Sequence, residues 1–198
     1  MIGKEMRPAI VMTLLICAIT GFLYPGVVTL VAQLLFPRQA NGSVILVGGR
    51  LVGSELVGQP FAAPYYFHPR PSAAGNGYDG TASGGTNKGP TDLKLADTLI
   101  AQAVEAVVTN DGGQKGHIPS DMVTASASGL DPHISPANAD LQVARVARER
   151  GADPAALQAL VKRYTEGRQF GFLGDPRVNV LRLNLAVDSA FPRSGAKR

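Results

Sequence analysis

The 198-residue sequence contains no tryptophan and a single cysteine, Cys17. One cysteine can form neither an internal disulfide nor a thiolate metal cluster. Aromatic residues make up only 6% of the chain, and its 19 Lys and Arg residues are scattered among 15 Asp and Glu residues. Nucleic-acid-binding domains usually carry a basic stripe or stacking aromatics, so these absences argue against a nucleic-acid partner.

Charge is missing from one long stretch. Residues 9–36, 28 in a row, contain no Asp, Glu, Lys, Arg or His. As a helix rising about 1.5 Å per residue the stretch would be about 42 Å long, more than the ~30 Å hydrocarbon core of a bilayer. A signal peptide has a shorter apolar core, and Arg38 makes cleavage after Ala40 unfavourable. We therefore predict an uncleaved single-pass transmembrane helix over 9–36, because the alternative, a buried core helix, would be shorter.

Pro25-Gly26 lies in the middle of this stretch and predicts a kink at Tyr24 and Pro25. A proline is tolerated in hydrocarbon when the carbonyls that it frees find other partners. The sequence leaves open whether the kinked helix packs on another membrane helix or faces lipid.

The flanking charges bear on the orientation of the helix. Lys4 and Arg7 precede it, and Arg38 and Arg50 follow it. The amino terminus adds one more positive charge on the first side, so the positive-inside rule leans towards a cytoplasmic N-terminus. We expect a short cytoplasmic N-terminus (1–8), the transmembrane helix (9–36) and a soluble extracytoplasmic domain (37–198).

The sequence of residues 37–198 predicts a small domain of the α+β class. Two apolar runs, 44–47 and 50–57, flank Gly48-Gly49 and predict a β-hairpin. Residues 58–90 are rich in glycine and proline and predict a long irregular loop, which its aromatic residues favour as ordered. Capping and periodicity predict three helices. The first runs from Thr91 or Asp92 to about Thr109, the second from Pro136 to Arg150 with Ser135 as its cap, and the third from Pro154 to Gly167 with Asp153 as its cap. The alternating residues 180–187 predict a final half-buried strand.

Two motifs resemble catalytic or phosphate sites without meeting their requirements. A phosphate-binding loop ends in Gly-Lys-Ser/Thr, whereas residues 83–90 end in Lys88-Gly89-Pro90 and favour a tight turn into a helix. Residues 124–135 offer serines with Asp131 and His133 but lack Gly-x-Ser-x-Gly, so these side chains can equally fix the loop before a helix. The histidines lack metal-ligand spacing, and we assign no catalytic and no metal-binding residue.

A third motif is the aromatic segment from Tyr65 to Ser72. Its aromatics can form a small core beneath a loop, or they can contact a partner, because aromatic residues and arginine suit the centre of an interface. Arg70 stands between two prolines, which suits either a fixed ion pair or an interface contact.

Several strings together resemble the C subunit of the Kdp potassium-transporting P-type ATPase. The resemblance covers about residues 8–190 in the family's order. The matching strings are Gly21–Pro25, Gln39–Ser43, Gly53–Phe61, Tyr66–Ser72, Tyr78-Asp79, Ser83–Pro90, Val123–Ser135, Gly171–Leu181 and Asn184–Asp188.

The resemblance implies a non-catalytic, single-pass subunit of a bacterial inner-membrane complex, with membrane lipid around its helix. Its partners would be a potassium-channel-like A subunit and an ATP-hydrolysing B subunit, with a small single-helix subunit as a further candidate. Those partners would handle ATP and potassium, and this chain would bind no cofactor of its own. The implied role is assembly and stability of the complex, together with a catalytic chaperone activity that raises the ATP affinity of the B subunit.

Two sets of site residues follow. The family's likeness to an ATP-binding-cassette signature implies nucleotide binding at Ser126, Ser128, Gly129 and Asp131. Our contact hypothesis for the channel-like subunit uses the aromatic segment and the polar loop, namely Tyr66, Phe67, Arg70, Ser83, Asn87 and Lys88.

The nucleotide set conflicts with export, because an exported domain cannot reach cytoplasmic ATP. Any effect on ATP would then be a coupling free energy transmitted through the subunits. The alternative function is a membrane-anchored extracytoplasmic enzyme or a cell-wall-binding domain. Such an enzyme would show intrinsic hydrolysis that is lost on changing His133 or Asp131.

Overall fold

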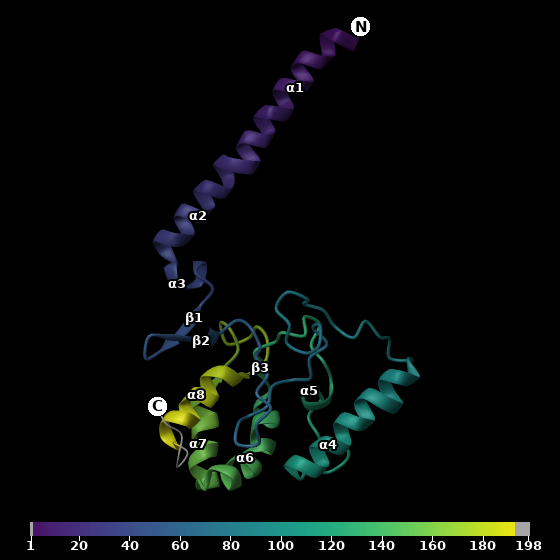
Figure 1. Cartoon of the computed structure of the whole chain (residues 1–198), viewed down its shortest axis with the longest axis vertical. Helices are drawn as coiled ribbons and strands as arrows, with labels where there is room; N and C mark the ends of the chain where they lie inside the picture. Colours follow the sequence, from purple (N-terminus) through teal and green to yellow (C-terminus); the bar gives the residue numbers. More distant parts are fainter. Residues whose placement is uncertain (1, 193–198) are drawn as a thin grey trace. The chain divides into compact units, whose positions relative to one another are not determined.

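A computed structural model describes residues 2–192, and the chain divides into two compact units, residues 1–52 and 53–198. The first unit begins with a long helix made of α1 (Ile2–Ala18), the π-helical turn η1 (Ile19–Leu23) and α2 (Tyr24–Leu35) (Figure 1). Within its stretch Gly3–Leu35, an 18-residue window reaches a mean hydropathy of 2.2 and has no buried part, so the helix is long and apolar enough to cross a membrane. The predicted apolar helix is present, and it begins earlier than expected.

The helix accommodates Pro25 with a π turn. Proline has no N–H to donate and its ring clashes with the preceding turn. Immediately before it, the N–H of Tyr24 donates to the carbonyl of Ile19, five residues back, which closes a wider turn than the α-helix does. The helix runs on through these residues in Figure 1. The structure thus has a π turn immediately before Tyr24 and Pro25, the position at which the sequence predicts a kink.

A short connection, held by side-chain hydrogen bonds, joins α2 to a β-hairpin. The side-chain amides of Gln33 and Asn41 bond each other reciprocally at 3.1 and 3.4 Å across the short helix α3 (Pro37–Ala40). The predicted hairpin follows as β1 (Val44–Val47) and β2 (Arg50–Ser54). Gly48 and Gly49 both have positive φ, as a two-residue hairpin turn requires. The second strand ends at Ser54, before the expected residue 57.

The second unit begins with the predicted irregular segment. Residues 55–92 contain no helix or strand. A helix then runs through η2 (Lys94–Ile100), which is π-helical, and α4 (Ala101–Asp111), close to the predicted bounds. The carboxylate of Asp92 accepts the N–H of Leu95 at 3.2 Å, and Gly112 ends the helix with φ +71°.

The helices α6 (Pro136–Arg150) and α7 (Pro154–Tyr164) confirm the capping argument. Ser135 Oγ accepts the N–H of Asn138 at 3.1 Å, and Asp153 Oδ1 accepts the N–H of Ala155 at 3.1 Å. Proline occupies the first turn in both, where its missing N–H costs nothing. The end of α7 at Tyr164 precedes the expected Gly167.

The predicted strand at 180–187 is wrong, because these residues form helix α8 (Val180–Ala190). Val180, Leu183, Asn184 and Val187 are buried, which is a helical spacing of three and four residues. The alternation of leucines with Arg182 and Asn184 predicts a strand only if Asn184 faces solvent, and Asn184 is buried. The true strand, β5, lies immediately before the helix.

Three short strands form an antiparallel sheet in the order β3-β5-β4. They are β3 (His133–Ile134), β4 (Thr165–Glu166) and β5 (Arg177–Asn179), and a one-turn helix α5 (Ser120–Val123) precedes them. Helix α7 packs on α6 and on α8, and all three helices pack on β5, which confirms the α+β class. The core that they enclose comprises Phe67, Ile134, Ala139, Val143, Val146, Ala147, Leu157, Val161, Val178, Val180, Leu183 and Val187.

Candidate functional site

The aromatic segment is held by its main chain. The side-chain amide of Asn184 on α8 accepts the N–H of Phe67 at 2.8 Å and donates to its carbonyl at 2.9 Å. The amide of Gln142 on α6 does the same for His68, at 2.7 and 3.0 Å. Each amide replaces the pair of bonds that a neighbouring strand would provide, so a segment without secondary structure has a fixed path.

A buried arginine extends this arrangement. Arg145 Nε donates to Asp111 Oδ1 at 2.7 Å, and the two side chains are only 3% and 6% exposed. Its other nitrogens donate to the carbonyls of Pro64 and Tyr66, the latter at 2.9 Å, and to Gln142 Oε1 at 2.7 Å. A buried charge is tolerated when it is paired and hydrogen-bonded, and this guanidinium is paired with Asp111 and donates from each of its three nitrogens.

A second arginine, Arg150, fixes the two tyrosines. Its Nε donates to the carbonyl of Tyr65 at 2.8 Å and its Nη2 to Asp188 at 2.7 Å. Its guanidinium carbon lies 5.2 and 5.0 Å from the ring centres of Tyr65 and Tyr66, within cation–π range. The hydroxyl of Tyr66 donates to Asp188 at 2.8 Å, and burial together with this bond raises the pKa of Tyr66.

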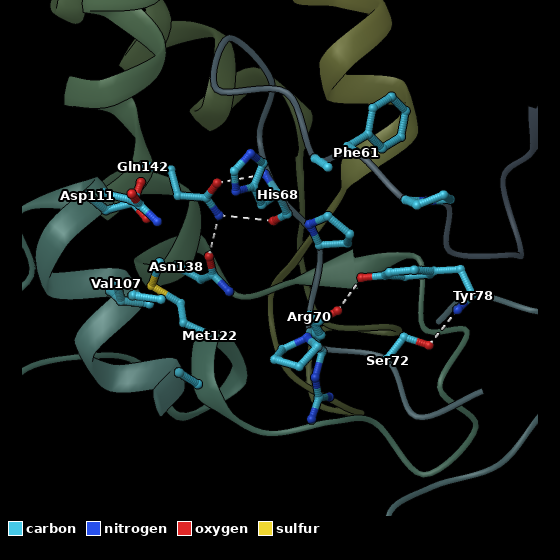
Figure 2. Close-up of a pocket in the computed structure, with 17 residues that line it drawn as sticks. Phe61, His68, Arg70, Ser72, Tyr78, Val107, Asp111, Met122, Asn138 and Gln142 are labelled. Carbon is cyan, nitrogen blue, oxygen red and sulfur yellow. Dashed lines mark hydrogen bonds between the residues drawn. The ribbon is translucent and has the colours of Figure 1, made fainter. Parts of the chain in front are cut away.

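Beside the segment lies a cavity of about 330 Å³ (Figure 2). One wall is the segment 60–72 with Tyr78, and the other is α4 with Val107. Tyr78 donates its hydroxyl to the carbonyl of Arg70, and burial raises the pKa of Tyr78 to about 12, so the phenol stays protonated. The polar wall groups Asn138 and Gln142 bond each other at 2.6 Å. Prolines and alanines share the rest of the lining with polar side chains such as Ser72, Asn110 and Asp111, so the cavity has a mixed apolar and polar surface.

The cavity wall includes a histidine whose titration should affect stability. Burial, and then the charge of Arg145, lower the pKa of His68. Between its ordinary value of about 6.5 and this lower value, the unfolded chain binds a proton that the folded chain does not. We expect the free energy of unfolding to fall as the pH drops below 6.5, by a fraction of the roughly 1.4 kcal/mol per pH unit that one proton can contribute.

Thermal unfolding of the full chain in detergent between pH 7.5 and 5.5 measures this effect. His68→Gln should flatten the pH dependence of the melting temperature. His117→Gln, which changes an exposed histidine, should leave it as in the unchanged chain. An unchanged slope in the first variant would contradict the prediction.

The structure brings three predicted segments together into one loop cluster, defined as residues 70–74, 83–85 and 126–131. Gly84 N–H and Ser83 Oγ both donate to the carbonyl of Ser128, at 2.9 and 3.0 Å. Ser72 Oγ donates to the carbonyl of Gly129 at 2.6 Å. The residues assigned to nucleotide binding therefore lie against residues assigned to partner contact.

Arg70 and Asp131 close the loop cluster with an ion pair of 3.2 Å. Burial alone would raise the pKa of Asp131, but hydrogen bonds from His133 and the charge of Arg70 outweigh it and lower that pKa. Ser135 donates its hydroxyl to Asp121 at 3.0 Å and caps α6. These bonds match the reading in which Asp131, His133 and Ser135 fix the loop before a helix.

The remaining predicted contact residues differ in exposure. Lys88 pairs with Asp92 at 2.7 Å at the start of the η2 helix, and Asn87 adopts a left-handed φ of +54° beside it. Tyr66 and Arg70 are partly exposed, whereas Phe67 is fully buried in the core. Phe67 therefore has no surface to offer a partner. Among residues 2–192, no group of three or more His, Cys, Asp or Glu side chains is placed to hold a metal ion.

Gly129 is required by packing. It is buried with φ +67°, and an added Cβ would lie 2.6 Å from the nitrogen of Ala74 and 2.7 Å from the carbonyl oxygen of Gly84. We expect Gly129→Ala to destabilise the second unit by about 1–3 kcal/mol, through overpacking added to backbone strain.

The melting temperature of the full chain in detergent tests this expectation. Gly151→Ala is the matched control, because Gly151 has φ +61° with open space around it. It shares the strain of a left-handed residue but not the clash, so the difference between the variants reports the close packing. Equal losses in both would show that packing around Gly129 is unimportant.

One exposed feature was missed by the sequence reasoning. Phe170 and Phe172 are 87% and 70% exposed on the loop between β4 and β5. The available signal was the string Gln169-Phe-Gly-Phe-Leu-Gly-Asp-Pro176, in which two aromatics flank a glycine between turn residues. An exposed aromatic pair on a turn is typical of a contact surface.

Comparison with known proteins gives matches over nearly the whole chain. The family described as KdpC, K+-transporting ATPase, c chain, matches residues 6–189. The potassium-transporting ATPase KdpC subunit of Gemmatimonas aurantiaca is 60% identical over 196 residues, which are 98% of each chain. Those of Koribacter versatilis and Methylococcus capsulatus are 53% and 56% identical over 189 and 187 residues. These alignments cover 96% of both chains in the first case, and 94% of this chain and 98% of the relative in the second.

Proposed function

The chain belongs to the KdpC family, and from this we propose that it is a non-catalytic accessory subunit of an ATP-driven, high-affinity potassium uptake complex. The observation that carries the proposal is the match over residues 6–189, which includes the apolar helix as well as the second unit. The role proposed is assembly and stability of a channel-like A subunit and an ATP-hydrolysing B subunit.

The proposed topology is single-pass in a bacterial inner membrane. Residues 1–8 would be cytoplasmic, 9–36 would cross the bilayer and 37–198 would be extracytoplasmic. An exposed apolar helix over Gly3–Leu35 supports this arrangement, since such a surface is stable in lipid. A single cysteine introduced at exposed Asn76, with Cys17→Ser, tests it. A membrane-impermeant maleimide should label spheroplasts before lysis, and labelling only after lysis would reverse the topology.

We place a contact with the channel-like subunit at the exposed parts of the aromatic segment and of the polar loop. The candidates are Tyr66, Arg70, Ser83, Asn87 and Lys88. The rigid path of the segment supports this choice, because a fixed surface loses little conformational entropy on binding. Tyr66 and Arg70 also bond within the domain, so their conservative variants are needed to separate contact from folding.

The proposed effect on ATP is indirect. The N–H of Gly129 already donates to the carbonyl of Ser126 and that of Leu130 to Ser128 Oγ, so these amides are not free to bind phosphate. If the domain is extracytoplasmic, a catalytic chaperone activity must reach the B subunit as a coupling free energy between subunits. The expected sign is a higher ATP affinity of the complex that contains this chain.

The test is co-expression of tagged full-length chain with the A-type and B-type subunits. Both partners should be recovered in detergent with the tag, and omitting this chain should lower the yield of an A–B complex and its potassium-stimulated ATP hydrolysis. Tyr66→Ala and Arg70→Ala should reduce recovery more than Tyr66→Phe and Arg70→Lys do. Recovery of a fully active A–B complex without the chain would refute the proposal.

A further inference from the structure

The hairpin of β1 and β2 is tied to the end of the apolar helix. Residues 1–52, which include the helix and most of the hairpin, form one compact unit (Figure 1). Asn41 Nδ2 donates to Gln33 Oε1 in α2 at 3.1 Å. The N–H of Ser43 donates to the carbonyl of Arg38 at 2.9 Å, and Ser43 is 4% exposed. The connection therefore has a fixed path, which holds the hairpin close to the helix.

Chain length limits how far from a bilayer the hairpin can lie. Its first residue, Val44, follows Asn41 by three residues, which span at most about 11 Å even when fully extended. The helix ends in Leu35 and is followed by Phe36, and these side chains are 66% and 56% exposed. A helix with an apolar end tilts in a bilayer so that this end stays at the hydrocarbon boundary. The hairpin then begins in the headgroup layer.

One face of the hairpin, which we call the aliphatic face, consists of Val44, Leu46 and Leu51. The two-residue turn places Leu46 opposite Leu51, and alternate residues of a strand share a face, which adds Val44. The three side chains are 45%, 62% and 66% exposed. A two-stranded hairpin is only marginally stable by itself in water, so covering this face would stabilise it.

The charge around the hairpin has one sign. Residues 36–54 contain Arg38 and Arg50, both exposed, and no Asp or Glu. Arg50 is opposite Val47 and so lies on the other face from the aliphatic face. Aliphatic side chains on one side and arginines on the other are typical of an element that lies on an anionic lipid surface.

We propose that the aliphatic face of the hairpin lies on an anionic phospholipid bilayer at the end of the membrane helix, an inference that rests on the topology proposed above. Its three side chains enter the boundary of the acyl chains, and Arg38 and Arg50 lie among the headgroups. The hairpin stays shallow, because the outward N–H and carbonyl groups of a two-stranded sheet need water or headgroups as partners. Interfacial elements of this kind enter by roughly 5–10 Å.

Three observations favour lipid over a protein partner. The hairpin is bonded to the end of a helix whose own surface is apolar and exposed, so the two apolar surfaces are continuous. Residues 37–54 contain no aromatic residue, and leucine and valine are under-represented among the residues that dominate protein interfaces. A second copy would need about 800 Å² from each chain, which three aliphatic side chains do not supply.

The test uses the full chain with Cys17→Ser in vesicles of phosphatidylethanolamine and phosphatidylglycerol. Leu46→Cys carries a fluorescent nitrobenzoxadiazole label, and Val47→Cys, 51% exposed on the opposite face, is the matched control. A lipid with a nitroxide near its headgroup should quench the label at position 46 roughly twofold more strongly than at position 47, because neighbouring residues of a strand face opposite ways. Iodide in the water should show the reverse order. Equal quenching at both positions would overturn the inference.

The lipid charge is tested separately. In vesicles of phosphatidylcholine the quenching at position 46 should weaken, and Arg50→Gln should reduce the difference between the two kinds of vesicle. Arg163→Gln, which changes an exposed arginine of the second unit, should leave that difference as it is. Quenching that is the same in both kinds of vesicle would overturn the assignment of an anionic surface.

A third label separates this inference from the topology. Val28→Cys places it in the middle of the helix, where a lipid with a nitroxide near the end of its acyl chain should quench it. If position 28 is quenched and position 46 is not, only the hairpin inference fails. If neither is quenched, the proposed topology fails with it.

Photocrosslinking in native membranes identifies what covers the face in the assembled complex. The full chain carries p-benzoylphenylalanine at position 46 and is co-expressed with the A-type and B-type subunits. Adducts with phospholipid, detected by mass spectrometry, support the inference. Adducts with either subunit or with a second copy of this chain overturn it.

Discussion

Replacing Arg145 with methionine is expected to lower the free energy of unfolding of the second unit by about 3–5 kcal/mol. The change leaves the carboxyl group of Asp111 without its ion-pair partner at 6% exposure. It also removes the donors to the carbonyls of Pro64 and Tyr66 and one donor to Gln142. Breaking a buried pair from one side costs more than the pair itself contributes, because the remaining charge has neither water nor a partner.

Chemical denaturation of the full chain in detergent, followed by circular dichroism, measures the loss. Arg148→Met is the matched control on the same helix, since Arg148 has a side chain 67% exposed in an ion pair with its neighbour Glu149. It should change stability by less than about 0.5 kcal/mol.

A second comparison tests the mechanism. Arg145→Met/Asp111→Leu removes both charges, so it should recover part of the stability that the single change loses. If Asp111→Leu lowered the free energy of unfolding as much in the Arg145→Met variant as it does in the unchanged chain, the unpaired carboxylate would not be the cause of the loss.

Phe67→Ala is expected to destabilise the second unit by a similar amount, about 3–5 kcal/mol. Phe67 is 0% exposed and packs in the core, while its N–H and carbonyl are held by Asn184. Removing the ring leaves a cavity that the surroundings cannot fill, because the main chain is held in place by the amide. For a domain of this size the melting temperature should fall by roughly 6–20 °C.

Thermal unfolding of the full chain in detergent checks this expectation. Phe172→Ala removes the same ring from an exposed position and is the matched control, with no expected change in melting temperature. If Phe67→Ala instead left the melting temperature unchanged and lowered only the recovery of partner subunits, Phe67 would be a contact residue and not a core residue.

Elements whose ends are marked by local chemistry could be predicted from the sequence. Ser135-Pro136 with Gly151, and Asp153-Pro154, set the starts of α6 and α7 and the end of α6, because capping bonds join residues only a few positions apart. The hairpin at Gly48-Gly49 follows the same logic. Such signals need no knowledge of the rest of the fold.

The wrong strand prediction at 180–187 and the contacts that were not predicted have a different physical cause. The alternating pattern at 180–187 predicts a strand with Asn184 facing solvent, yet Asn184 is buried on helix α8 and bonds Phe67, 117 residues away in the chain. The partners of Gln142 and Arg145 are equally remote in the chain. Buried polar residues whose partners lie far along the sequence give no periodic signal, so tertiary structure decides their place.

The candidate site was predicted in part. The segments containing Arg70, Ser83 and Asp131 were identified separately, and their contact with one another emerged only from the fold. The exposed pair Phe170 and Phe172 was missed because hydrophobic residues in a sequence are first assigned to the core. A positive φ at Phe170 cannot be read from its identity.

The amide and guanidinium groups that hold residues 64–68 bind main-chain atoms, which every amino acid supplies. The path of this segment is therefore largely indifferent to the side chains that it carries at its exposed positions. Mutations there can change what the surface recognises without moving the backbone that presents it. The exposed side chains and the backbone path can therefore evolve separately. A subunit of this kind can change its surface as the sequence of its partner changes, while its backbone stays the same.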